Sequence, residues 1–397
     1  MDPDDFPTPD EPVDELTPAT LRDQIEADQD VTILDARASG DFEEWHIDGE
    51  TVEIENVPYF HFLDDELDDD VLADVPEGDP LVVLCAKGGA SEYVAGRLAE
   101  EGHEVVHLEE GMNGWASIYE SVEIQGYDSP GTVLQYQRPS SGCLGYLIYS
   151  DEEAAVIDPL QAFTDRYLDD ADELGVDLKY AFDTHIHADH ISGVRALDEE
   201  GVTGVIPEQA VDRGVTYADE LATATDGDTF EVGDVTVETV YTPGHTSGMT
   251  SYLVGESLLT TGDGLFVESV ARPDLEEGDE GAPDAARQLY ETLQERVLAL
   301  DDDVLVGGAH FSDAAEPAED GTFTAPIGQL REQMDPLTYD EGEFVETVLA
   351  DMPPRPANYE EIIATNLGQR DTDEQEAFTL ELGPNNCAAS SDSMTSD

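Results

Sequence analysis

The sequence predicts two successive folded domains, an α/β domain followed by a larger, β-rich domain. In the first part, the apolar runs at 31–35 and 81–84 alternate with helical patterns at 21–25 and 91–101, as expected when helices cover a sheet. The run 81–84 is wholly apolar, which indicates a parallel sheet buried on both faces. Turn-forming residues at 126–130 are typical of a boundary. Beyond them, short runs of alternating apolar and polar residues predict further strands.

Composition predicts where these domains begin and end. Residues 1–16 are acidic and Pro-rich, so we expect a disordered leader. We then expect an α/β domain over 17–125, a linker over 126–131 and the second domain over 132–372. The polar residues 373–397 are expected to be a disordered tail.

The chain carries a formal net charge of −80, with 95 acidic residues against 15 Lys and Arg. This charge excludes nucleic acid as a partner. An acidic surface that binds a basic partner would concentrate its acidic residues in one part of the chain, whereas here they are spread along the whole sequence. Salt shortens the reach of such repulsion from about 30 Å at 0.01 M to about 3 Å at 1 M. We therefore expect the high-salt cytoplasm of a halophile. No stretch resembles a secretory signal or a membrane span, so we expect no membrane association.

The densest group of chemically active residues follows the apolar run 178–182. It holds three His and one Asp within six positions, and the pattern of an apolar run ending in His or Asp recurs three times downstream. A divalent ion needs several nitrogen and oxygen ligands fixed at neighbouring strand ends. Scattered, unrelated histidines would not repeat this pattern, so it predicts a metal site. The candidate ligands are His185, His187, Asp189, His190, His245, Asp263 and His310.

The H-x-H-x-D-H motif at 185–190, with T-P-G-H at 242–245, T-G-D at 261–263 and A-H at 309–310, resembles the metallo-β-lactamase superfamily. The resemblance covers roughly residues 130 to 370 and implies an αββα sandwich. It also implies one metal on His185, His187, His245 and Asp263. Dinuclear members would hold a second metal on Asp189, His190, Asp263 and His310. In a mononuclear site, Asp189 would instead form a hydrogen bond to a metal ligand or to metal-bound water. It could also cap a helix starting near Ile191.

Residues 264–275, with Arg272 and Asp274, and residues 352–368 resemble the persulfide dioxygenase branch of that superfamily. The resemblance implies a single Fe(II) on His185, His245 and Asp263. The other candidate ligands, His187, Asp189, His190 and His310, would then support that site or hold a second metal. Arg272 would anchor a substrate carboxylate, because guanidinium pairs bidentately; an ion pair with Asp274 is the alternative.

Three cysteines, Cys85, Cys143 and Cys387, are too few for a disulfide framework. Cys85 directly follows the apolar run 81–84 and precedes a loop of small residues that leads into a helix. Backbone N–H groups in such a loop, with Lys87 nearby, would favour a thiolate and a sulfur-bound anion. An inert buried thiol is the alternative. We interpret Cys143, which lies in an apolar run, as an inert buried thiol of this kind.

With residues 34–37, 42–47 and 110–115, the Cys85 loop resembles a rhodanese (sulfurtransferase) domain over roughly residues 15 to 125. The resemblance implies that Cys85 carries a persulfide and that Lys87 lies near its substrate. Ala90 stands where an Arg is frequent, which leaves the sulfur donor open.

The two resemblances imply one sulfur chemistry. We expect an Fe(II)-dependent persulfide dioxygenase with one iron per chain, which oxidises a low-molecular-weight thiol persulfide with O₂ to sulfite. The rhodanese domain would pass sulfane sulfur between Cys85, thiol, sulfite and thiosulfate. The alternative is a thioester hydrolase of the glyoxalase II type with two Zn(II). A non-enzymatic sulfur carrier is disfavoured because no candidate ligand is missing. The sequence allows a homodimer.

Overall fold

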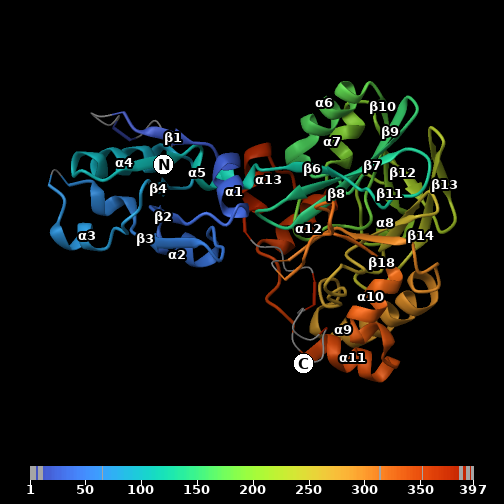
Figure 1. Cartoon of the computed structure of the whole chain (residues 1–397). Helices are drawn as coiled ribbons and strands as arrows, with labels where there is room; N and C mark the ends of the chain where they lie inside the picture. Colours follow the sequence, from blue (N-terminus) through green and yellow to red (C-terminus); the bar gives the residue numbers. More distant parts are fainter. Residues whose placement is uncertain are drawn as a thin grey trace. The chain divides into compact units, whose positions relative to one another are not determined.

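The computed structural model describes residues 6–7, 12–64, 66–312, 314–350, 352–383, 388–389 and 394. The chain divides into two compact units, Met1–Ile118 and Tyr119–Asp397. Their elements are labelled in Figure 1. Among the described residues, no helix is both long enough and apolar enough to cross a bilayer.

The first unit is a five-stranded sheet in the order β1-β5-β4-β2-β3, with every neighbouring pair parallel. Its strands are β1 (Asp14–Leu16), β2 (Val31–Asp35), β3 (Val52–Asn56), β4 (Leu81–Leu84) and β5 (Val105–Leu108). Its helices are α1 (Pro18–Glu26), α2 (Ser39–Glu44), η2 (Tyr59–Phe62), α3 (Asp69–Ala73), α4 (Gly89–Glu100) and α5 (Gly111–Ala116).

The side chains of β4 alternate between two separate apolar cores, which confirms the sheet predicted to be buried on both faces. Leu81 and Val83 pack into a core with α4, whereas Val82 and Leu84 pack into a core with α1 and α5. Helix α1 begins at Pro18, and its N-cap residue Thr17 accepts at Oγ1 a hydrogen bond from the backbone N–H of Thr20.

The second unit contains two sheets. The seven-stranded sheet has the order β12-β11-β10-β9-β8-β7-β6, and the six-stranded sheet has the order β13-β14-β15-β16-β17-β18. The strands of the first of these sheets are β6 (Glu120–Glu123), β7 (Thr132–Arg138), β8 (Cys143–Ser150), β9 (Glu153–Ile157), β10 (Asp177–Phe182), β11 (Thr203–Pro207) and β12 (Ala222–Ala224). Those of the second are β13 (Thr229–Val232), β14 (Val235–Tyr241), β15 (Thr250–Val254), β16 (Leu258–Gly262), β17 (Leu305–Gly308) and β18 (Thr324–Pro326).

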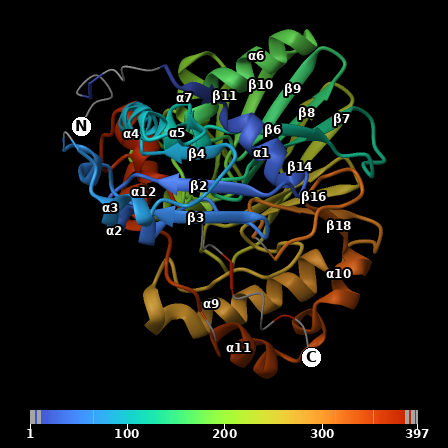
Figure 2. The ribbon, with the colours of Figure 1, turned by 60° about the vertical axis from the view of Figure 1, so that its left-hand side comes forward.

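Helices cover the outer faces of both sheets, as Figure 2 shows for α6 and α7 beside β9–β11 and for α9, α10 and α11 below β16 and β18. One core lies between the sheets, with Ile148 from the first and Tyr252 from the second. Two further cores lie beneath the helices. The predicted αββα sandwich is confirmed. Its helices are η3 (Gln161–Phe163), α6 (Thr164–Leu174), α7 (Val194–Glu199), α8 (Glu208–Val211), α9 (Gly278–Thr292), η4 (Leu293–Val297), α10 (Ile327–Gln333), η5 (Asp335–Thr338), α11 (Glu341–Ala350), α12 (Tyr359–Asn366) and α13 (Glu374–Leu380).

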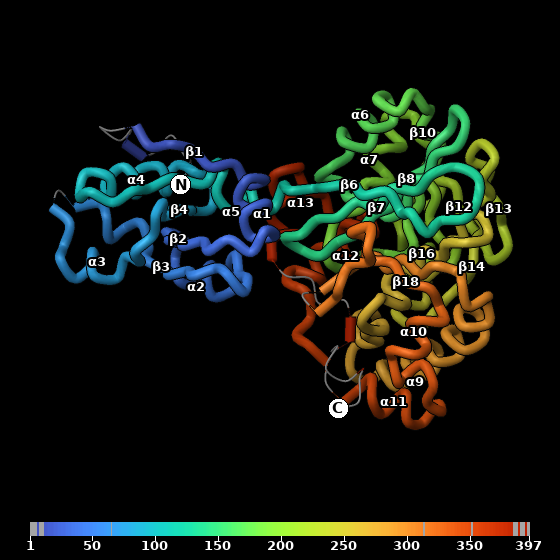
Figure 3. Tube along the Cα trace, viewed as in Figure 1, coloured from blue at the N-terminus to red at the C-terminus, as the bar shows by residue number. Residues whose placement is uncertain are grey.

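Three predicted boundaries differ from the structure. The leader expected over 1–16 ends in β1, which pairs with β5 through Leu16 and Leu108. The second unit begins at Tyr119, before the linker expected over 126–131, because β6 pairs with β7. The tail expected over 373–397 starts with α13, whose first turn is capped by the side chain of Asp373. Figure 3 traces the chain through α12 and α13, in red, back towards β7 and β8.

Candidate functional site

The strand directions gather the candidate ligands at one edge of the second unit. β14, β16 and β17 run the same way in their sheet, so the residues that follow them meet at the same edge. β9 and β10 are parallel in the other sheet, and the H-x-H-x-D-H loop follows β10. His185, His245 and Asp263 come together there, each at most 1% exposed. We call these three residues the first cluster.

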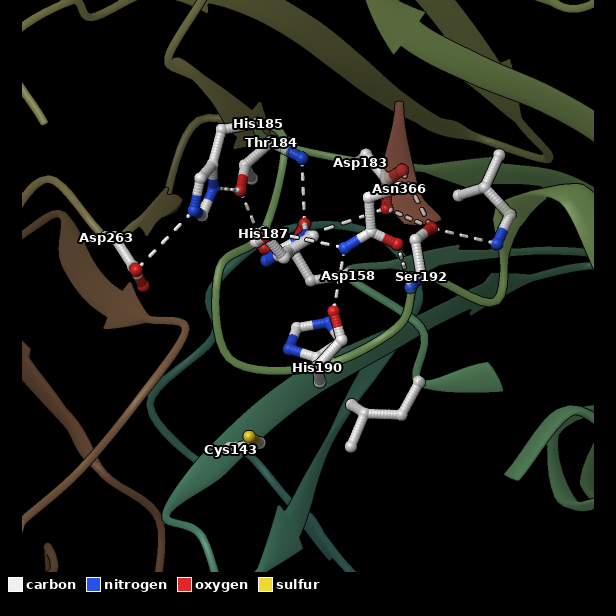
Figure 4. A network of polar contacts seen from close by, with 12 residues as sticks. Cys143, Asp158, Asp183, Thr184, His185, His187, His190, Ser192, Asp263 and Asn366 are labelled. Carbon is white, nitrogen blue, oxygen red and sulfur yellow. Dashed lines mark hydrogen bonds and ion pairs between the residues drawn. The ribbon is translucent and has the colours of Figure 1, made fainter. Parts of the chain in front are cut away.

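Hydrogen bonds fix the tautomers of both histidines in the first cluster. Thr184 Oγ1 donates to Asp158 Oδ2 at 2.9 Å and therefore accepts from His185 Nδ1, also at 2.9 Å. His185 lies next to Thr184 and directs its ring towards Asp263 (Figure 4). His245 Nδ1 donates to the carbonyl oxygen of Arg272 at 2.9 Å. With Nδ1 protonated in each ring, Nε2 keeps the lone pair that a metal ligand needs.

The geometry of the first cluster fits one metal ion. Asp263 Oδ2 lies 3.5 Å from His185 Nε2 and 3.4 Å from His245 Nε2. Two ligands about 2.0–2.2 Å from a shared ion are separated by roughly 2.8–3.6 Å. All three atoms are buried without a hydrogen-bond partner among the described residues, which is costly unless an ion meets them. The donor set is two imidazoles and one carboxylate, a set that leaves coordination positions open.

The pKa shifts in the first cluster favour the protonation states in which these side chains bind a metal, namely neutral imidazole and ionised carboxylate. Burial, followed by the charge of His187, lowers the pKa of His185 to about 4. Burial also lowers the pKa of His245. For Asp263, burial acts to raise the pKa, but His310 and His185 outweigh it and hold that pKa well below its usual range. The imidazoles are therefore neutral and the carboxylate is ionised at neutral pH.

His187 lies in a different group from His185 and His245. Its Nε2 is 3.2 Å from Asp158 Oδ1 and 3.6 Å from Asp183 Oδ1. Burial and His190 act to lower the pKa of His187, but Asp158 and Asp183 outweigh them and raise it to about 9. Neither carboxylate was predicted from the sequence as a site residue, although Asp158 directly follows β9 and Asp183 directly follows β10.

Asp189, His190 and His310 form a second cluster, and Cys143 belongs to it. One ligand atom from each of the four residues lies within 4.8 Å of the others, and all four residues are buried. Cys143 packs into an apolar core, as its place in an apolar run predicts, and its sulfur also lies beside a carboxylate and two imidazoles. The helix-cap role considered for Asp189 is absent, since α7 begins only at Val194.

Asn366, at the end of α12, holds the ligand loop in shape. Its Nδ2 donates to the carbonyl oxygens of His187 and His190, at 3.0 and 2.8 Å, and its Oδ1 accepts from the backbone N–H of Ser192 at 2.9 Å. Figure 4 shows the amide lying across the loop. Asn366 was not predicted individually from the sequence, because no local pattern links it to a loop nearly 180 residues earlier.

Arg272, the expected anchor of a substrate carboxylate, is buried and paired within the protein. The side chain is 1% exposed. Its Nε and Nη2 atoms bond to the Asp274 carboxylate at 2.8 and 3.1 Å, and its Nη atoms donate to the carbonyl oxygens of Pro353 and Pro354. These contacts match the structural ion pair that was the alternative interpretation. Arg272 contacts the first cluster through its carbonyl oxygen, which accepts from His245 Nδ1.

In the first unit, Cys85 directly follows β4 and is 5% exposed. The Gly88 N–H donates to Cys85 Sγ at 3.2 Å, as the predicted loop requires. The Cys85 carbonyl oxygen accepts from the backbone N–H of Met112 at 2.8 Å. A Cβ at Gly111 would lie 2.0 Å from that carbonyl oxygen, so only glycine fits. Lys87 and Cys85 line a pocket of about 360 Å³. Cys387 lies outside the described residues.

Comparison with known proteins finds relatives for both parts of the chain. Residues 140–310 match the family model of the metallo-beta-lactamase superfamily, and residues 17–118 match the rhodanese-like domain. The human mitochondrial persulfide dioxygenase ETHE1 is 32% identical over 189 residues, covering 47% of this chain and 70% of the human protein. Hydroxyacylglutathione hydrolase GloC of Haemophilus influenzae is 27% identical over 185 residues, covering 42% of this chain and 84% of that protein.

Solved structures agree with this assignment. The crystal structure of ETHE1 from Myxococcus xanthus is 29% identical and has a TM-score of 0.51, covering 59% of this chain and 98% of that chain. A metallo-beta-lactamase from Staphylococcus aureus is 25% identical, with a TM-score of 0.54 and coverage of 59% and 72%. With a rhodanese-like domain at residues 17–118, the chain belongs through its second unit to the ETHE1 persulfide dioxygenase family of the metallo-β-lactamase superfamily.

Proposed function

We propose that the second unit is a persulfide dioxygenase with one Fe(II) on His185, His245 and Asp263. The observation that carries this proposal is the first cluster itself. It has two neutral imidazoles and one carboxylate, whose facing atoms have no hydrogen-bond partner among the described residues. This is the ligand set of iron sites that leave open positions for O₂ and a substrate. The similarity to human ETHE1 supports the same reaction.

The proposed reaction converts a thiol persulfide, O₂ and water into the thiol, sulfite and two protons. The terminal sulfur is oxidised, O₂ is reduced, and the sulfur–sulfur bond breaks to release the thiol. When bound, iron supplies the positions at which O₂ and the persulfide sulfur meet. The protein holds the ligands fixed, since His310 Nδ1 lies 2.7 Å from the second oxygen of Asp263. The buried site also excludes bulk water, which would compete for the same positions.

A pocket of about 230 Å³ reaches the first cluster at His245. Ser247, Pro273 and Glu276 are among its lining residues. We propose this pocket as the entry route of the thiol persulfide.

For the first unit, we propose sulfur transfer at Cys85. With thiosulfate as donor, the thiolate attacks the sulfane sulfur, the sulfur–sulfur bond of thiosulfate breaks, and sulfite leaves while Cys85 carries the persulfide. The Gly88 N–H aimed at Cys85 Sγ would stabilise the anionic sulfur. Lys87 lines the same pocket and would attract an anionic donor. Sulfur on Cys85 could then pass to a thiol, which forms the substrate of the second unit.

Thioester hydrolysis with two Zn(II) is the second candidate. It is favoured by the similarity to hydroxyacylglutathione hydrolases and by the second cluster beside the first. A metal-bound hydroxide would then be the nucleophile.

The deciding experiment combines metal analysis of anaerobically purified protein with oxygen consumption on a thiol persulfide. Iron in the first cluster, at about one per chain, together with oxygen uptake is the expected result. Two zinc ions per chain, no oxygen uptake and hydrolysis of a glutathione thioester would overturn the dioxygenase and establish the hydrolase.

A further inference from the structure

Phe6 is the only aromatic residue in the acidic, Pro-rich stretch 1–16. Its ring packs against the apolar core of the first unit that contains Cys85. The centroids of the Phe6 and Tyr59 rings are 5.3 Å apart and their planes meet at 83°, an edge-to-face geometry that aromatic pairs prefer. The Tyr93 ring lies 6.4 Å from Phe6. Phe6 therefore packs on η2, which carries Tyr59, and on α4, which carries Tyr93.

Phe6 and Tyr59 both line the pocket of about 360 Å³ that holds Cys85. We call these two side chains the aromatic wall. The backbone N–H of Tyr59 donates to the carbonyl oxygen of Ala36 at 2.9 Å, which fixes Tyr59 beside the end of β2. Phe6 reaches the same pocket from nearly 80 residues before Cys85 in the sequence. Four alanines supply further apolar lining: Ala36, Ala38, Ala86 and Ala90.

The charged groups that line the Cys85 pocket largely offset one another. Arg37 lines it, but its Nη2 and Nε bond to Asp35 Oδ2 at 2.6 and 3.0 Å. The other charged residues among the described lining are Lys87 and Asp41, which have opposite signs. An inorganic dianion therefore meets little net positive charge in this pocket, whereas the carbon skeleton of an organic molecule meets an apolar surface.

We propose that Phe6 is a specificity-determining residue for sulfur transfer at Cys85, and that the aromatic wall receives the apolar part of a low-molecular-weight organic thiol. This thiol is the sulfur acceptor. As a thiolate it attacks the outer sulfur of the Cys85 persulfide, whose proton stays on that sulfur. The sulfur–sulfur bond to Cys85 breaks, Cys85 leaves as a thiolate, and the acceptor leaves as its persulfide. The inference rests on the proposed sulfur transfer and names the class of its acceptor.

The test measures sulfite release from thiosulfate by the full chain, with either benzyl thiol or cyanide as acceptor. Cyanide takes the sulfur as thiocyanate and has no apolar group to place against the wall. For Phe6→Ala, the ratio of kcat/KM for benzyl thiol to kcat/KM for cyanide should fall about three- to tenfold, as expected for the loss of one aromatic contact. Phe6→Leu keeps apolar bulk and should recover part of this loss.

Phe60→Ala is the matched control. The Phe60 ring also packs on Tyr59, with centroids 6.0 Å apart, but Phe60 is 52% exposed and is not among the described residues that line the pocket. This variant should leave the ratio of the two kcat/KM values unchanged. An equal fall for Phe60→Ala and Phe6→Ala, or an unchanged ratio for Phe6→Ala, would overturn the proposal.

A second measurement needs no turnover. The rate at which Cys85 is alkylated by N-benzyl iodoacetamide is compared with the rate for iodoacetamide, by mass spectrometry of the peptide that contains Cys85. The benzyl reagent should be favoured in the unmodified sequence, and Phe6→Ala should reduce this preference about three- to tenfold.

The two measurements separate this inference from the proposed sulfur transfer. No sulfite release, with the benzyl preference present, would overturn the sulfur transfer and leave the aromatic wall as a binding site for an organic ligand. Sulfite release without a benzyl preference, and with the same acceptor ratio in Phe6→Ala, would overturn the role of Phe6 and leave the sulfur transfer.

Discussion

The buried ion pair between Arg138 and Glu381 provides a sharp test of how the C-terminal segment is fastened to the second unit. Arg138 Nη1 lies 2.7 Å from Glu381 Oε2, and each side chain is 1% exposed. The other oxygen of Glu381 accepts the backbone N–H of Ile191, next to the ligand loop, at 2.8 Å. Removing the carboxylate would leave a buried guanidinium without its counter-charge, which typically costs about 3–5 kcal/mol.

We therefore expect Glu381→Ala to lower the free energy of unfolding by about 3–5 kcal/mol. At about 2–4 °C per kcal/mol, the melting temperature should fall by roughly 6–20 °C. Glu381→Gln should lie at the low end, because its amide oxygen can still accept from one of the two donors, Arg138 or Ile191. Both variants are measured by chemical and thermal denaturation at molar salt.

The matched control is Glu376→Gln in the same helical segment. Glu376 pairs with Arg370 at 2.7 Å, but their side chains are 46% and 32% exposed, so its loss should cost at most about 1 kcal/mol. Equal, small losses for Glu376→Gln and Glu381→Ala would refute the argument. Replacing Arg138 and Glu381 together by Met and Leu should recover most of the stability, because well-packed apolar residues substitute for buried pairs.

Four further predictions follow from other features. Thr184→Val removes the acceptor of His185 Nδ1 and should weaken metal binding at the first cluster by about 10–100-fold. In a metal titration, Thr250→Val, at a buried threonine whose Oγ1 has no partner among the described residues, should leave the affinity unchanged; equal losses would contradict the role of Thr184. Burial raises the pKa of Glu268, so its ionised form costs stability above that pKa and the cost vanishes as the pH falls below the ordinary carboxyl range. Glu268→Gln should therefore stabilise the protein at neutral pH and not in acid, and denaturation curves that shift equally at both pH values would refute this. Cys85→Ser should abolish sulfur transfer from thiosulfate but keep oxygen uptake on preformed persulfide, and loss of both activities would exclude independent units. Below roughly 0.5 M salt the protein should unfold as its charges lose screening, whereas an unchanged melting temperature would remove the high-salt interpretation.

The ligands of the first cluster could be predicted because their signal is local. His185, His245 and Asp263 each follow an apolar strand, and parallel strand directions bring such ends together. Asp158 and Asp183 gave the same signal, but a single carboxylate is inconspicuous in a chain with 95 acidic residues.

The rest depends on contacts between distant parts of the chain. Cys143 lies in an apolar run of the sequence. It joins the second cluster through an antiparallel β-bridge with the distant residue His310. Arg272 was interpreted from a motif, while its actual partners include carbonyls about 80 residues away. The short elements β1 and α13 lie in acidic, polar stretches that show no apolar pattern. β1 is held by pairing with β5, and α13 is capped by Asp373.

The fastening of the ligand loop by Asn366 and Glu381 sets an order of events during synthesis. Every strand of the five-stranded sheet in the first unit is complete once residue 108 has been made. The first unit can therefore fold while translation continues. The loop over 185–190 leaves the ribosome much earlier than the two residues that fix its shape. Until residue 381 emerges, its histidines are held only in part. We therefore expect selective metal loading at the proposed site to be a late step, because a loop that is held only in part can still release an ion that binds early.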